Sequence, residues 1–214
     1  MTGNLDMRQI YVAQLRIHAH ELIAGGYRLL DAPSFATQEE TAITGELVRC
    51  MKEFMESNEA SGWAVHYDIA EDPPLNVAGR LGKSRPRVDI EFLRTGAPGA
   101  RPRLLFEAKR LQQSSGHTVG VYLGRDGLGC FLSGKYPITH GEAGMLGYIQ
   151  SGSESEWSNK IEKALSDHGE RYGVTPPAFQ PRQLCSLKHT YLSRHHGRQG
   201  SGYITIHHVL LLFH

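Results

Sequence analysis

The sequence has no apolar run long enough to cross a membrane. No hydrophobic stretch in its 214 residues reaches the roughly 18 to 20 residues that a spanning helix needs. The first ten residues, MTGNLDMRQI, also lack a basic region followed by an apolar core, so no secretory signal is predicted. We therefore expect a cytoplasmic protein with no membrane partner.

Cysteine is scarce as well. The chain holds three cysteines, Cys50, Cys130 and Cys185, which are odd in number and far apart. That pattern does not fit a disulfide scaffold, and the absence of a CxxC pair gives no support to a zinc knuckle. We expect reduced thiols that serve as small buried apolar side chains. With 40% hydrophobic and 21% charged residues, the composition is that of an ordinary soluble domain.

Net charge is also small, at +1, but the charges are unevenly distributed. Residues 31–60 hold seven acids against two bases, a balance of −5, whereas residues 80–110 hold nine bases against three acids, a balance of +6. Segment 182–198 adds four bases and no acid. Two basic segments can present a positive face to a polyanion such as DNA. Solvated loops that are simply rich in arginine fit the same charges.

Helical spacing of apolar residues predicts two helices in the first quarter of the chain. The first covers about Asp6 to Ile23 and stops at Gly25 and Gly26. The second begins at Thr37, where Thr37 and Glu40 have the spacing of a capping box. Its apolar stripe consists of Ile43, Leu47, Cys50 or Met51, and Phe54.

The pattern then changes to that of strands. Alternation predicts strands at Trp63–Ile69, Val88–Leu93 and Leu104–Lys109, with a loop at 71–87. The last two strands are separated by a turn-rich connection and are expected to pair as a hairpin.

The second half of the chain is less regular. The glycine-rich stretch 114–144 fits a flexible loop or a short irregular hairpin, while Glu142–Gln150 and Ser155–Tyr172 are interpreted as helices. Two strands, Leu184–Ser193 and Tyr203–Phe213, end the chain. The predicted fold class is α/β, with a mixed central sheet flanked by helices and a C-terminal strand pair. We expect a single domain over 1–214, divided into an N-terminal helix (1–30), a core (37–110), a loop with helices (111–172) and the C-terminal strands (184–214).

Two of the predicted strands carry charged residues at alternating positions. Val88, Ile90 and Phe92 are expected on one face of the first strand, with Asp89 and Glu91 on the other. Glu107 and Lys109 share a face of the second strand. Pairing of the strands would bring Asp89 beside Glu107, with Lys109 next in line. Two carboxylates and the carbonyl of Ala108 are hard oxygen ligands suited to Mg²⁺ or Mn²⁺. The alternative is a hairpin whose charged residues only form cross-strand pairs on a solvent face.

These residues resemble the catalytic motif of the PD-(D/E)XK nucleases, which share the restriction-endonuclease-like fold. Asp89 matches the aspartate of that motif, and Glu107-Ala108-Lys109 matches its Glu-X-Lys. The resemblance covers roughly residues 37–110, and it departs from the motif at Pro86, three residues before Asp89 rather than directly before it.

The resemblance implies a metal-dependent nuclease that hydrolyses phosphodiester bonds of DNA, in restriction, repair or anti-phage defence. Asp89, Glu107 and the carbonyl of Ala108 would hold the metal, and Lys109 would act on water or phosphate. An acid of the upstream helix joins such sites; Glu40 is preferred here over Glu39 and Glu46. The bases between Arg80 and Arg110, among them Arg85, Arg87 and Arg110, would grip the DNA backbone. Gln150, with Tyr148, is a candidate for positioning substrate.

Several alternatives stay open at this point. The chain is either an active nuclease or a catalytically inactive module of the same fold, and RNA is an alternative substrate. A homodimer or a partner ATPase or defence subunit is compatible with the sequence. Five histidines cluster near the C-terminus, namely His189, His195, His196, His207 and His208. Exposure on the surface or packing within the hairpin of the last two strands is the preferred interpretation, and zinc binding or phosphate contact are the alternatives.

Overall fold

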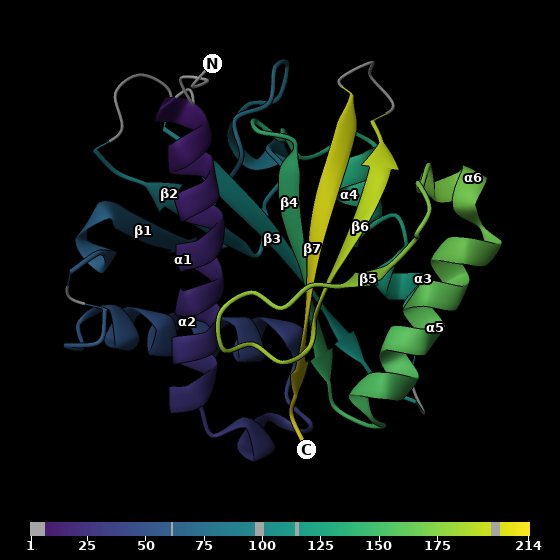
Figure 1. The fold of residues 1–214 in the computed structure, drawn as a ribbon, viewed down its shortest axis with the longest axis horizontal. Coiled ribbons are helices and arrows are strands. Elements are labelled where there is room, and N and C mark those ends of the chain that lie inside the picture. Colours follow the sequence, from purple (N-terminus) through teal and green to yellow (C-terminus); the bar gives the residue numbers. More distant parts are fainter. Residues whose placement is uncertain (1–6, 61, 97–100, 114–115, 198–201) are drawn as a thin grey trace, which may run out of the picture.

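The computed structural model of the protein describes residues 7–60, 62–96, 101–113, 116–197 and 202–214. A seven-stranded mixed sheet flanked by helices forms its centre, which confirms the predicted α/β class (Figure 1). The strand order is β1-β2-β3-β4-β7-β6-β5. The strands are β1 (Tyr67–Glu71), β2 (Ile90–Arg94), β3 (Arg103–Leu111), β4 (Glu142–Ile149), β5 (Gln180–Pro181), β6 (Thr190–His196) and β7 (Tyr203–Leu212).

The sheet combines antiparallel margins with a parallel centre. β1, β2 and β3 pair antiparallel, β3, β4 and β7 pair parallel, and β7, β6 and β5 pair antiparallel again. The predicted hairpin of β2 and β3 is therefore confirmed. The parallel strands are buried almost throughout, as expected where helices cover both faces of a sheet.

Each face of the sheet packs against its own helices. α1 (Met7–Leu29) and α2 (Glu40–Met55) cover one face, while α3 (Val119–Tyr122), α4 (Gly129–Leu132) and α5 (Glu154–Asp167) cover the other. Side chains of β4 alternate between the two cores, with Leu146 and Tyr148 in the first and Met145 and Ile149 in the second. A short helix α6 (Gly169–Tyr172) follows α5, and one-turn 3₁₀ helices occupy Ala32–Phe35, Ala64–His66 and Gly82–Ser84. No helix among the described residues is both long and apolar enough to cross a membrane.

α1 runs through Gly25 and Gly26, where the sequence predicted its end. A Cβ atom on Gly25 would lie 2.3 Å from Cδ1 of Phe54, and one on Gly26 would lie 2.5 Å from Cγ of Met51. The two glycines therefore allow α1 and α2 to approach closely. Tertiary packing, rather than a helix stop, explains the pair.

α2 begins three residues later than predicted. Glu40 is its first residue and Glu39 its N-cap, with no side-chain capping bond, so the capping box predicted from Thr37 is wrong. The predicted apolar stripe is confirmed: Ile43, Leu47, Cys50, Met51 and Phe54 are all buried.

Two strands also begin later than predicted. The first half of the predicted strand Trp63–Ile69 is a 3₁₀ turn, and β1 begins at Tyr67. β2 begins at Ile90, so Val88 precedes the regular alternation and packs in the second core, whereas Ile90 and Phe92 pack in the first. The expectation that these three side chains share a face is wrong for Val88.

The predicted helix Glu142–Gln150 is strand β4. Its two glycines make room for large neighbours, because a Cβ on Gly144 would lie 2.1 Å from Cε1 of Phe106 and one on Gly147 2.6 Å from Cδ2 of Leu210. A central parallel strand is apolar on both faces and lacks the alternation that identifies a strand in sequence.

The glycine-rich stretch before β4 is largely ordered structure. Within its described part, 116–144, α3 and α4 bury Tyr122, Leu123, Leu128, Cys130 and Phe131 against the second face of the sheet. The expectation of a flexible loop or an irregular hairpin is therefore wrong there, and residues 114 and 115 lie outside the described residues.

The C-terminal part follows the predicted order. The helix expected at Ser155–Tyr172 is divided into α5 and α6, and the first of the two strands begins at Thr190 rather than Leu184. His195, His207 and His208 are buried within the β6–β7 pair and its packing, which confirms the packing interpretation for these three. His189 instead forms an ion-pair contact with Glu154, 3.3 Å between Nδ1 and Oε2, and His196 lies beside Tyr203.

Candidate active site

Pairing of β2 with β3 brings Asp89 and Glu107 together. Ile90 lies opposite Phe106, so the residue before Ile90 and the residue after Phe106 are neighbours. Oδ2 of Asp89 accepts a hydrogen bond of 2.6 Å from the backbone N–H of Ala108. The side chains are not solvated: Glu107 is only 6% exposed and Lys109 only 9%. A hairpin with charged residues on a solvent face does not describe this arrangement.

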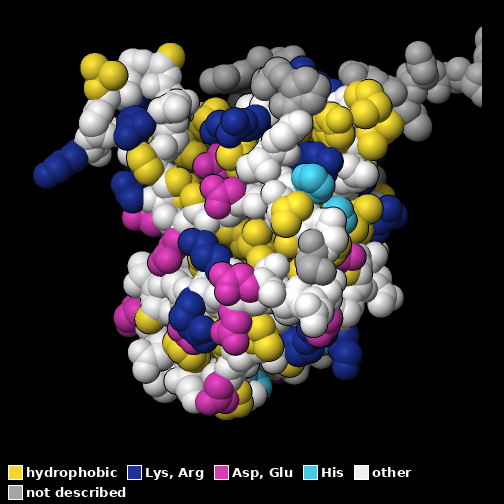
Figure 2. Space-filling model, turned by 90° about the vertical axis from the view of Figure 1, so that its left-hand side faces the viewer, with side chains coloured by type: hydrophobic (Ala, Val, Ile, Leu, Met, Phe, Trp, Pro, Cys, Tyr) yellow, Lys and Arg dark blue, Asp and Glu magenta, His cyan; other side chains and the backbone are white. Residues whose placement is uncertain are grey.

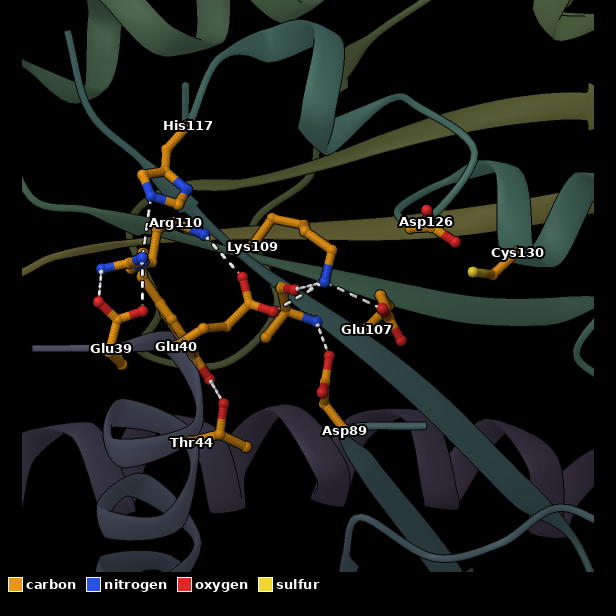
Figure 3. A network of polar contacts seen from close by, with 12 residues as sticks. Glu39, Glu40, Thr44, Asp89, Glu107, Lys109, Arg110, His117, Asp126 and Cys130 are labelled. Carbon is orange, nitrogen blue, oxygen red and sulfur yellow. Dashed lines mark hydrogen bonds and ion pairs between the residues drawn. The ribbon is translucent and has the colours of Figure 1, made fainter. Parts of the chain in front are cut away.

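The Lys109 ammonium group lies at the centre of the cluster (Figure 3). Its Nζ donates to Oε1 of Glu40 at 2.8 Å, to Oε1 of Glu107 at 3.0 Å and to the carbonyl oxygen of Ala108 at 2.6 Å. Three oxygens thus surround one positive charge, and two of them belong to the predicted metal-ligand set.

Among the three helix glutamates that the sequence proposed, Glu40 is the one that contacts Lys109. It is the first residue of α2, and its second oxygen, Oε2, accepts a 3.2 Å hydrogen bond from the backbone N–H of Arg110. Glu39 points outward and pairs with Arg110, while Glu46 pairs with Arg49 on the exposed side of α2. The preference for Glu40 agrees with this geometry.

Burial and mutual repulsion perturb the acids of the cluster. Burial raises the pKa of Asp89 above its ordinary value, against the opposing effects of the Ala108 amide and Lys109. Burial and then the negative charge of Asp89 raise the pKa of Glu107 to about 8. Burial lowers the pKa of Lys109, but the carboxylates of Glu107, Glu40 and Asp89 together outweigh it and leave the pKa above its usual range. Lys109 is therefore an ammonium ion, suited to donate hydrogen bonds and not to accept a proton.

Tyr136 is a site residue that the sequence did not single out. Its hydroxyl lies 2.6 Å from the carbonyl oxygen of Arg87 and 2.9 Å from Oε2 of Glu107, in the connection between α4 and β4. Burial, and then the charge of Glu107, raise the pKa of Tyr136, so the phenol keeps its proton. This tyrosine links Glu107 to the backbone just before Asp89. Its segment has weak periodicity and fits either a flexible loop or an irregular hairpin, so no sequence pattern marked this tyrosine.

The three arginines proposed to bind substrate are not gathered in the cluster. Arg110 is buried and forms a salt bridge with Glu39, 2.6 Å between Nη2 and Oε2, with His117 on its other side. Arg85 donates to Asn76 and Arg87 to Asp72, both within the 72–87 loop. Arg110 thus holds the start of α2 against β3, whereas Arg85 and Arg87 belong to a surface loop.

Gln150 follows the end of β4 and is not on a helix. Its amide nitrogen donates to the carbonyl oxygens of Phe35 and Gln38, at 2.9 and 2.8 Å, and its oxygen accepts from Gln112. Gln150 therefore holds the segment that leads into Glu40, and its polar atoms are occupied by protein. Tyr148 is fully buried, with its hydroxyl 3.0 Å from that of Thr44.

The donor set fits a hard divalent cation. Asp89, Glu107 and the Ala108 carbonyl supply oxygen atoms only. Burial raises the pKa of both acids, and a bound cation would favour their ionised forms. Within the described part of the chain, no group of three or more histidine, cysteine, aspartate or glutamate side chains is arranged to hold a metal. Two carboxylates and a carbonyl are nevertheless a usual protein share for Mg²⁺, which keeps several water ligands.

Comparison with protein-family models, with curated proteins and with solved structures finds no match for this chain. The geometry of the cluster itself is therefore the basis for inferring what the protein does.

Proposed function

We propose that the protein is a metal-dependent nuclease of the PD-(D/E)XK type, with a restriction-endonuclease-like core, that hydrolyses phosphodiester bonds of DNA. The observation that supports this most strongly is that Asp89, Glu107 and Lys109 lie side by side, with Glu107 and Lys109 buried, Asp89 half-buried and Glu40 joined to the lysine. Buried ionised groups are costly unless a function or a partner retains them. A module kept only for its fold has no need of a buried Glu107 and Lys109 with Asp89 and Glu40 bound beside them.

In this proposal Asp89, Glu107 and the Ala108 carbonyl hold Mg²⁺ or Mn²⁺. When bound, the cation supplies Lewis acidity, which lowers the pKa of water and offsets charge on the scissile phosphate. Because Lys109 donates to both Glu107 and the Ala108 carbonyl, its ammonium group would have to leave these oxygens for them to hold a cation. It is then available to orient the attacking water or to donate to a phosphate oxygen.

The remaining residues position these groups. Glu40 holds Lys109 close to the strand and, with Glu107, keeps it protonated, because its carboxylate bonds both the ammonium group and the backbone N–H of Arg110. Tyr136 holds one oxygen of Glu107, and Gln150 holds the segment before Glu40. Preorganisation of this kind is what a hydrolytic site requires, since small displacements of charged groups reduce the rate sharply.

The test is a cleavage assay on supercoiled plasmid, single-stranded DNA and RNA in Mg²⁺, Mn²⁺ or EDTA. Wild type should cleave DNA with metal and not with EDTA, and Asp89→Ala and Lys109→Ala should abolish cleavage while retaining the folded circular dichroism spectrum. Glu91→Gln is the matched acid control, because Glu91 lies two residues from Asp89 and pairs with Arg103 instead. Lys163→Ala, in the exposed pair with Asp167, is the lysine control.

Two results would contradict the proposal. Wild type that neither cleaves DNA nor binds Mn²⁺ by calorimetry argues for an inactive module of the same architecture. Cleavage restricted to RNA retains the chemistry but replaces the substrate. If Mn²⁺ binding is present and is lost in Asp89→Ala, yet no substrate is cut, the site is intact and depends on a further subunit.

A further inference from the structure

Residues 72–87, most of the connection between β1 and β2, carry features that the catalytic cluster does not use. This basic loop holds Arg80, Lys83, Arg85 and Arg87 against one acid, Asp72. Arg85 and Arg87 are engaged within the loop, by Asn76 and Asp72. The exposed side chains of Arg80 and Lys83, in contrast, make no hydrogen bond or ion pair with any residue that the structure describes.

Leu81 lies between these two free cations and is 86% exposed, more than any other large hydrophobic side chain among the described residues. The loop projects at the upper left of Figure 2, where dark blue basic side chains flank yellow apolar ones. Single exposed leucines are common on protein surfaces, so exposure alone says little. The backbone that carries Leu81 is more informative.

That backbone is held in a fixed turn. The hydroxyl of Ser84 accepts from the backbone N–H of Leu81 at 3.0 Å and donates to its carbonyl oxygen at 2.7 Å. Gly79 and Gly82, on either side, have φ values of +76° and +54°, in the left-handed region that suits glycine. The turn thus presents an apolar side chain outward in one orientation, with a cation on each side.

The base of the loop is joined to the catalytic cluster. The backbone N–H of Asp72 donates to the carbonyl oxygen of Asp89 at 2.9 Å, and that of Leu75 donates to Pro86 at 2.8 Å. The carbonyl of Arg87 accepts from Tyr136, whose hydroxyl also contacts Glu107. The base of the loop therefore adjoins the cluster, and a polyanion bound at Asp89 and Glu107 would lie next to that base.

The surface beside the loop is less suited to a polyanion. α2 and the turn that follows it carry Glu46, Glu53, Glu56 and Glu59 along with Arg49 and Lys52, and Figure 2 shows acidic and basic side chains interspersed over that face. Charge complementarity thus favours the loop over α2 as the nucleic-acid contact.

We infer that the basic loop grips double-stranded DNA beside the scissile phosphate, with Arg80 and Lys83 on phosphates and Leu81 inserted between neighbouring bases. This inference rests on the proposed function and extends it to a distorted duplex as substrate. Apolar side chains that enter a groove between base steps unstack them and bend the DNA, and flanking cations offset the cost through phosphate contacts.

The experiment uses the full chain in EDTA and, separately, in Ca²⁺, with duplexes that carry 2-aminopurine at successive positions; gels verify that the DNA stays intact. Binding is followed by anisotropy and unstacking by 2-aminopurine fluorescence. Wild type should raise the fluorescence at one or two adjacent positions. Leu81→Ser should bind with an affinity within about threefold of wild type and lose most of the fluorescence change, because phosphate contacts dominate affinity.

Val65→Ser is the matched control, since Val65 is 72% exposed and lies just before the opposite end of β1. It should behave as wild type. Arg80→Gln and Lys83→Gln should each reduce the slope of log affinity against log salt by about 1.

The inference is overturned if bound duplex shows no fluorescence change at any position, or if Leu81→Ser matches wild type. Preferential binding of single strands, of RNA or of no nucleic acid overturns it as well. Failure of the proposed function is distinguished by the separate plasmid assay. Metal-dependent cleavage without duplex distortion would overturn the insertion of Leu81 between bases and leave the proposed nuclease activity standing.

Discussion

The Nζ atom of Lys109 lies 2.8 Å from Oε1 of Glu40, although the two residues are 69 positions apart. This contact joins the start of α2 to the middle of the sheet. It makes the helix glutamate a part of the same charged cluster as Asp89 and Glu107.

Replacing Glu40 should impair catalysis without removing the metal ligands. Glu40→Gln loses the charge that holds Lys109, so we expect cleavage to fall about 10- to 100-fold, the usual effect of removing a group that orients an active-site side chain. Mn²⁺ affinity measured by calorimetry should change less than the rate. Glu46→Gln, on the same helix and paired with Arg49, should cleave as wild type; equal losses in both variants would remove Glu40 from the site.

Glu107 should make the metal-free protein less stable as pH rises. Its pKa is about 8 when folded and 4.5 as the ordinary value, so the folded state binds the proton more tightly than the unfolded state. The contribution to stability is complete below pH 4.5 and is lost as pH rises through 8, on the order of a few kcal/mol in total.

Urea denaturation in EDTA at pH 6 and pH 9 measures this effect. Glu107→Gln should flatten the pH dependence and be the more stable protein at pH 9, while losing metal binding. Glu170→Gln, at an exposed position, serves as control. A Glu107→Gln protein that loses stability between pH 6 and 9 as steeply as wild type contradicts the prediction.

A buried chain of hydrogen bonds should produce sensitivity to acid. Nδ1 of His195 contacts the Tyr172 carbonyl at 2.9 Å and must donate; its Nε2 then accepts from Ser193. Ser193 in turn accepts from Nε2 of His208, and Tyr122 donates to Nδ1 of that ring at 3.0 Å. With both rings neutral, every group in this chain is paired.

Burial lowers the pKa of His195 to about 4, so the unfolded state binds protons more readily. Stability is therefore complete above pH 6.5 and falls as pH drops toward 4, by on the order of 3 kcal/mol for this residue. Denaturation at pH 7.5 and 5.0 should show a smaller loss in His195→Asn than in wild type. His168→Asn, at an exposed position, should keep the wild-type loss; an unchanged loss in His195→Asn would contradict the role of the chain.

The contact between α1 and α2 should not tolerate a side chain at Gly25. Gly25→Ala places Cβ against the Phe54 ring, and overpacking of this kind costs about 1–3 kcal/mol. Thermal unfolding should show the loss, and Phe54→Leu in the same chain should recover part of it. Gly62→Ala, which has no atom within 4 Å of the added Cβ, is the control. A Gly25→Ala protein as stable as wild type would contradict the packing role.

The sequence alone determined those features that depend on local periodicity. The stripe Ile43, Leu47, Met51 and Phe54 specified a helix, and the alternation around Ile90 and Phe106 specified a hairpin. Because side chains alternate along a strand, the same pattern placed Glu107 and Lys109 on one face and predicted Asp89 beside them.

Only the tertiary structure decided the features that depend on what surrounds a segment. β4 was mistaken for a helix because a strand buried on both faces has no alternation of apolar and polar residues. Its glycines, Gly144 and Gly147, leave room for the side chains of Phe106 and Leu210. Gly25 and Gly26 are likewise explained by the close packing of α1 against α2. The selection of Glu40 over Glu46, and the contact of Tyr136 with Glu107, result from elements that are distant in sequence and adjacent in space, which no local pattern records.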